Sequence, residues 1–87
     1  MAGPPTELTF IYRSGCHLCE QMWRELEPFR NSPGLVIKPL DLAAEPSLED
    51  AYGDKVPLLR HSDNEICRYF LDAEQLHCYL QSVQSSD

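Results

Sequence analysis

The sequence predicts an α/β fold in which helices flank a four-stranded mixed sheet. An apolar segment, Leu8–Tyr12, is followed by residues with helical spacing and then by a second apolar segment, Leu35–Leu40, as in a right-handed βαβ unit. Two further strand-like segments, Val56–Arg60 and Glu65–Tyr69, are separated by a turn and followed by an amphipathic helix. The predicted element order is therefore β-α-β-α-β-β-α.

Length and charge restrict the class of protein. The 87 residues suffice for one core, so we expect a single domain over residues 1–87, a monomer, with flexible tails at 1–7 and 84–87. The net charge of −7 leaves little to neutralise phosphates, which argues against nucleic-acid and membrane partners. No apolar run approaches the roughly 20 residues that cross a bilayer, and the first residues do not resemble a signal peptide. We therefore expect a cytoplasmic protein with reduced thiols.

The first strand and first helix meet at a turn. Leu8–Tyr12 is rich in β-branched and aromatic residues, and Ser14-Gly15 is a turn signal. A helix should begin at Cys16 and end or kink at Pro28, because proline lacks the backbone donor that the helix needs. The apolar positions of this helix are spaced by four, four and three residues: Leu18, Met22, Leu26 and Phe29.

Prolines help to place the second predicted strand in the sheet and to locate the start of the second predicted helix. Leu35–Leu40 is an almost continuous apolar run, typical of a parallel strand, but Pro39 places it at a sheet edge. A short helix is expected from Glu45, with Pro46 at its first position, to Gly53.

The last three elements are expected to be a hairpin and a helix. Asp63 and Asn64 favour the turn conformations that a hairpin needs, so Val56–Arg60 and Glu65–Tyr69 should pair in antiparallel fashion. Asp72 should start the last helix, with Gln75 completing a capping box. The buried stripe of this helix should be formed by Leu76, Tyr79, Leu80 and Val83.

Two cysteines lie where the first strand meets the first helix. The first helical turn has unpaired N–H groups and a partial positive charge, which stabilise a thiolate at Cys16. Cys19 follows one turn later, within reach for a disulfide. A buried cysteine pair or half of a zinc site are the alternatives, but no second Cys-x-x-Cys or His-x-x-x-His motif completes four zinc ligands. The pattern favours a redox dithiol.

This arrangement resembles the small glutaredoxin-like members of the thioredoxin superfamily over about residues 8–83. The resemblance rests on Cys16-His17-Leu18-Cys19 after a strand, Val56-Pro57 opening the third strand, and the closing hairpin and helix. It implies a thioredoxin fold and thiol–disulfide oxidoreductase activity, with Cys16 as nucleophile and Cys19 as resolving thiol. It also implies that Pro57 is cis and that the Val56 backbone pairs with the substrate.

The resemblance suggests roles for further residues near the dithiol. Arg13 corresponds to a family cation that holds the thiolate or a glutathione carboxylate, although it could be only a solvated charge. His17 would tune the stability of the disulfide or simply be exposed. Asp72 would offer a carboxylate or helix-start N–H groups to a substrate. Cys67 and Cys78 are expected to be packing or surface residues.

The glutathione seat of the family is altered in this sequence. Tyr69 and Phe70 stand where glutaredoxins carry two glycines, and Lys55 replaces the family threonine. We therefore expect no bound cofactor, poor use of glutathione, and better reduction by a thioredoxin-type reductant or a dedicated protein partner. The expected substrates are disulfide-bearing proteins or small molecules. The alternative is a non-catalytic binding module or a carrier of a metal or iron–sulfur cluster.

Overall fold

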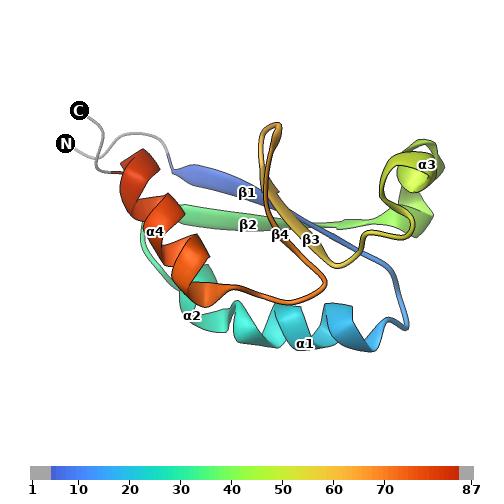
Figure 1. The fold of residues 1–87 in the computed structure, drawn as a ribbon, viewed down its shortest axis with the longest axis horizontal. Coiled ribbons are helices and arrows are strands. Elements are labelled where there is room, and N and C mark those ends of the chain that lie inside the picture. The colour runs from blue at the N-terminus through green and yellow to red at the C-terminus, as the bar shows by residue number, and fades with distance from the viewer. Residues whose placement is uncertain (1–4, 85–87) are drawn as a thin grey trace.

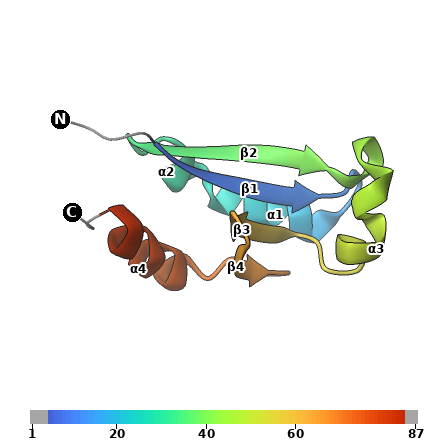
Figure 2. The same ribbon diagram turned by 90° about the horizontal axis from the view of Figure 1, so that it is seen from above.

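The computed structural model describes residues 5–84 and contains one four-stranded mixed sheet (Figures 1 and 2). The central strand β1 pairs in parallel with β2 and antiparallel with β3, and β3 pairs antiparallel with β4. The spatial order is β2-β1-β3-β4, so β2 is an edge strand, as its proline predicted. The strands are β1 (Thr6–Tyr12), β2 (Leu35–Asp41), β3 (Leu58–His61) and β4 (Asn64–Arg68).

Helices and short 3₁₀ turns connect and cover these strands, which confirms the predicted α/β fold class and element order (Figure 1). Within residues 5–84, no helix has the length and apolar character needed to cross a membrane. The helical segments are α1 (His17–Glu25), α2 (Glu27–Arg30), η1 (Leu42–Ala44), η2 (Pro46–Leu48), α3 (Glu49–Tyr52) and α4 (Ala73–Gln84).

The two faces of the sheet bury two separate apolar clusters. Successive strand residues point to opposite faces, so Phe10 belongs to one cluster and Ile11 to the other. The larger cluster lies between the sheet and helices α1 and α4, which contribute Met22 and Leu76. The smaller cluster lies on the face covered by η1, with Leu42 at its centre. The face under α1 is the one that supports the dithiol.

The long first helix predicted from the sequence is divided at Leu26. The Leu26 N–H donates to the carbonyls of Met22 and Arg24, and α2 then begins with Pro28 in its first turn. Proline cannot donate the next helical hydrogen bond, so the predicted kink occurs just before it.

The first strand and the last helix both extend further than the sequence predicted. Strand β1 begins at Thr6, whose N–H donates to the Gly34 carbonyl at 2.8 Å, so the expected tail over 1–7 is wrong for Thr6 and Glu7. Pairing with β2 across seven residues explains this extension. Gln84 ends α4 instead of belonging to a tail, and the remaining tail residues 1–4 and 85–87 lie outside the described part of the chain.

The predicted helix over 45–53 is also wrong in detail. Glu45 has a non-helical conformation (φ −133°, ψ 73°), and the segment forms one 3₁₀ turn, η2, followed by one α-helical turn, α3. Strand β3 starts at Leu58, after the proline that cannot donate to the ladder. Strand β4 ends at Arg68 because Tyr69 has a left-handed backbone (φ 69°).

Candidate active site

Cys16 occupies the N-cap of α1, one residue before the helix that was expected to include it. Gly15 supplies the positive φ (81°) that turns the chain from β1 into α1. The Cys16 Sγ accepts a hydrogen bond from the backbone N–H of Cys19 at 3.1 Å. This is the capping geometry usually supplied by serine or aspartate, and it directs an unpaired helix donor at the sulfur. Backbone N–H groups at helix starts are among the donors that favour thiolates in proteins.

Cys19 has a different environment from Cys16. Its side chain is 2% exposed and belongs to the core cluster under α1, whereas Cys16 is half-buried at the edge of that cluster. Burial, followed by hydrogen bonding with the Cys16 sulfur, raises the pKa of Cys19 to about 12, against the opposing effect of a backbone hydrogen bond from Arg13. Both thiols are free. The pair therefore combines one accessible sulfur with one that holds its proton.

Arg13 is engaged by α3. Its Nη2 donates to Glu49 Oε1 at 2.6 Å and to the Gly53 carbonyl at 2.9 Å. The hydrogen bond and charge of Glu49 raise the pKa of Arg13. Glu49 and Gly53 were not identified from the sequence as partners of Arg13, because only the tertiary fold brings α3 beside the end of β1.

The Val56–Pro57 peptide bond is cis, as the resemblance predicted. Pro57 is buried, and its carbonyl accepts a hydrogen bond from the Tyr69 N–H at 2.7 Å. Val56 is half-buried against the same core cluster as Cys16. Among residues 5–84, no hydrogen bond occupies the backbone N–H or carbonyl of Val56.

The other two predicted site residues lie at helix starts. His17 is the first residue of α1 and is exposed. Asp72 caps α4, since its Oδ1 accepts the Gln75 N–H at 3.0 Å, which is one of the two hydrogen bonds of the predicted capping box. This hydrogen bond engages one oxygen of the carboxylate that the resemblance assigned to substrate binding.

Aromatic side chains fill the segment where the family places its glycines. Tyr69 keeps a left-handed backbone, which glycine adopts without strain, and its Oη donates to the Asp54 carbonyl at 2.9 Å. Phe70 is 65% exposed. The surface beside Pro57 therefore presents aromatic bulk.

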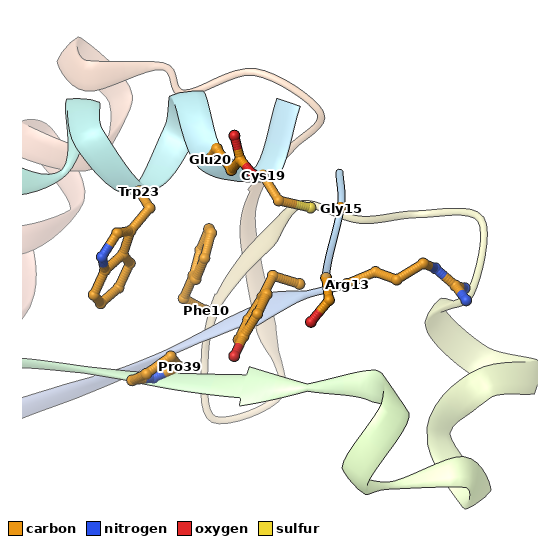
Figure 3. A pocket seen from close by; sticks show the side chains of 9 residues that line it. Phe10, Arg13, Gly15, Cys19, Glu20, Trp23 and Pro39 are labelled. Carbon is orange, nitrogen blue, oxygen red and sulfur yellow. The ribbon is translucent and has the colours of Figure 1, made fainter. Parts of the chain in front are cut away.

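A groove of about 380 Å³ lies beside the dithiol between α1 and the β1–β2 edge of the sheet (Figure 3). We did not predict this groove from the sequence. A signal was present, because Phe10 and Tyr12 share one face of a strand and Trp23 lies one helical turn after Cys19. Its walls are formed by Phe10, Tyr12, Cys19, Glu20, Trp23 and Pro39.

The two remaining cysteines are on β4 and α4 and not at the start of α1. Cys67 is half-buried on β4, where burial raises its pKa, and Cys78 is exposed on α4. No cluster of three potential metal ligands of the His, Cys, Asp or Glu type occurs in the described chain.

Comparisons with known proteins agree with this geometry. The family described as Glutaredoxin-like domain (DUF836) matches residues 7–81. The chain is similar to a Nitrosomonas europaea protein solved by NMR, with 31% identity, a TM-score of 0.74, and coverage of 91% of this chain and 95% of the other. It is also similar to an X. campestris protein solved by X-ray diffraction, with 31% identity, a TM-score of 0.67, and coverage of 86% and 96%. Curated protein sequences give no match.

A more distant structural match supports the fold. A thioredoxin from Halobacterium salinarum is 19% identical, with a TM-score of 0.66 and coverage of 93% of this chain and 76% of the other. At this identity the match speaks to the fold alone, and it agrees with the predicted thioredoxin fold. Because the family match spans nearly all of the described residues, the chain belongs to the glutaredoxin-like domain family.

Proposed function

We propose that this protein is a thiol–disulfide oxidoreductase that uses Cys16 and Cys19 to reduce disulfides. The observation that supports it best is the hydrogen bond from the Cys19 N–H to the Cys16 Sγ at the start of α1. It stabilises negative charge on a sulfur that is partly open to solvent, and a thiolate is the nucleophile of disulfide exchange.

The proposed reaction has two exchange steps. The Cys16 thiolate attacks one sulfur of the substrate disulfide, which forms a mixed disulfide and releases the first substrate thiolate. The Cys19 thiolate then attacks the Cys16 sulfur, releases the second substrate thiolate and leaves a Cys16–Cys19 disulfide. Two electrons pass to the substrate, so a reductant that supplies two electrons, either one dithiol or two monothiols, must restore the protein.

The environment of Cys19 fits the second step. Hydrogen bonding with the Cys16 sulfur is one of the causes that raise the pKa of Cys19. Once Cys16 is joined to the substrate, its sulfur no longer carries the charge that holds the Cys19 proton. Cys19 thus remains protonated before the first step and becomes easier to deprotonate after it.

A protein disulfide is the preferred substrate class in this proposal. The free backbone N–H and carbonyl of Val56 can pair with an extended substrate segment, as in strand addition. Tyr69 and Phe70 crowd the place where glutathione would dock, so we propose a thioredoxin-type reductant.

Two single variants and a control test the proposal. Cys16→Ser should abolish reduction of a model disulfide, whereas Cys19→Ser should accumulate a mixed disulfide that mass spectrometry detects on Cys16. Cys78→Ser, an exposed cysteine on α4, should react like the unchanged protein. Retained activity in Cys16→Ser would refute the assignment.

A further inference from the structure

The groove beside Cys19 has aromatic walls. The rings of Phe10 and Tyr12 are stacked with centroids 5.7 Å apart, and the Trp23 ring lies 5.1 Å from Phe10. Pro39, on the edge strand β2, borders the open side (Figure 3). A volume of about 380 Å³ accommodates one long side chain together with ordered water.

Two charged residues line the groove, Arg13 and Glu20, and a third, Arg30, stacks on the ring of Trp23 with its guanidinium 4.3 Å from the ring centroid. Arg13 borders the groove, but its guanidinium extends away from the aromatic rings toward α3, where Glu49 neutralises it (Figure 3). Glu20 is exposed on α1 and has no ion-pair partner within the described residues, including Arg24 one turn further on. The whole chain carries a net charge of −7. A cationic group is therefore attracted to this opening.

We infer that the groove binds an arginine or lysine side chain of the disulfide-bearing protein substrate. This inference rests on the proposed function, because the substrate must first reach Cys16. Both side chains combine an apolar stem, which suits aromatic walls, with a cation that can interact with Glu20 and with the rings of Phe10 and Tyr12. The Trp23 ring already has a cation–π partner in Arg30. The turn at Gly15 links the groove to Cys16, so a chain attached to Cys16 can also enter the groove.

Other side chains match this groove less well. An acidic side chain would meet the charge of Glu20 in addition to the net negative charge of the protein. An apolar side chain would fill the aromatic part but leave Glu20 without a partner. A basic residue near the substrate cysteine is the side chain that satisfies both parts of the surface.

The first test compares peptide disulfides in a single turnover with the reduced protein. The peptides differ at one position near the cysteine, which carries arginine, its uncharged isostere citrulline, or glutamate, and the variable position is moved along the peptide. We expect the best arginine peptide to oxidise the protein roughly three to ten times faster than its citrulline counterpart. Added salt should reduce this ratio.

Matched variants locate the effect on the groove. Glu20→Gln should lower the arginine-to-citrulline ratio toward one, whereas Glu25→Gln, on the same helix but outside the groove, should leave the ratio unchanged. Equal rates for arginine and citrulline peptides at every position would overturn the inference. An equal effect of the two variants would overturn it as well.

A binding measurement separates this inference from the proposed activity. Trp23 is the only tryptophan of the chain and lines the groove, so its fluorescence reports occupancy. A cysteine-free arginine peptide should change this fluorescence in Cys16→Ser, and a citrulline peptide should do so more weakly. Absence of reaction with every peptide would refute the proposed function, whereas absence of an arginine-dependent fluorescence change would refute the groove inference.

Discussion

The starts of helices α1 and α4 have the same hydrogen-bond pattern but carry different side chains in the N-cap position. At α1, the Cys16 Sγ accepts the Cys19 N–H at 3.1 Å and the Cys16 carbonyl accepts the Glu20 N–H at 3.0 Å. At α4, the Asp72 Oδ1 accepts the Gln75 N–H at 3.0 Å and its carbonyl accepts the Leu76 N–H at 3.0 Å. At both helix starts the side chain of the N-cap residue accepts a hydrogen bond from the backbone N–H three residues later.

The difference between the two starts lies in what surrounds the cap. Cys16 packs against the core and stands beside a second, buried thiol, whereas Asp72 is exposed. A carboxylate in water already carries its charge, so its hydrogen bond mainly stabilises the helix. At Cys16 the same hydrogen bond is accepted by a sulfur, which is the nucleophile of the reaction that we propose. The hydrogen-bond pattern is the same at both helix starts. The residue in the N-cap position and the residues packed around it are what differ.

The largest expected effect concerns the buried thiol of the first helix start. Because the pKa of Cys19 is raised to about 12, the folded protein keeps this proton at pH values where the unfolded chain loses it. Folding stability should therefore fall as pH rises above about 8.5, the ordinary cysteine value, with a limiting slope of about 1.4 kcal/mol per pH unit. Urea unfolding between neutral pH and pH ~10 measures this slope.

The control for this measurement is Cys19→Ala, which removes the titrating group. The variant should be less stable at neutral pH but should show a flatter dependence on alkaline pH. If the wild-type protein and Cys19→Ala lose stability in parallel as pH rises, groups other than Cys19 cause the loss. That result would contradict the prediction.

The second effect separates capping from reactivity. Asp72→Ala removes an N-cap and should lower the free energy of unfolding by about 1 kcal/mol, because one helix donor loses its partner. Cys16→Ser should change stability much less, since serine is itself a good N-cap. Thermal or urea unfolding of the two variants, with Asp72→Asn as the conservative control, gives the comparison. A loss in Cys16→Ser as large as that in Asp72→Ala would contradict it.

The smallest effect concerns the residues before the second helix start. Tyr69→Gly should increase the rate of reduction by glutathione, roughly three- to tenfold, because it opens backbone for hydrogen bonds that contribute about 0.5–1.5 kcal/mol each. The left-handed backbone at this position accommodates glycine. A coupled assay with glutathione and its reductase measures the change. The control is Ser82→Gly, which introduces a glycine at an exposed position on α4 without removing a side chain that packs against the core.

The wild-type protein sets the baseline for that assay. We expect slow turnover with glutathione and faster turnover with a thioredoxin-type reductant. Rapid reduction of the unchanged protein by glutathione would show that Tyr69 and Phe70 do not obstruct the site.

The sequence by itself determined the elements whose causes are local. Runs of β-branched, aromatic and other apolar residues predicted the strands, Asp72 predicted the start of α4, and Pro28 predicted the break in the first helix. The Cys16–Cys19 spacing and Val56-Pro57 predicted the family, which the match over residues 7–81 confirms. Each of these depends on hydrogen bonds or side-chain periodicity within a few residues, which a linear pattern records.

Only the tertiary structure decided the features that join distant segments. Glu49 neutralises Arg13 across 36 residues, and β2 extends β1 to Thr6 by pairing along its whole length. The groove beside Cys19 forms because α1 and the edge strand stand apart around Phe10 and Trp23. Charge pairing and cavity shape depend on which surfaces meet in three dimensions, and no spacing within the chain specifies that meeting.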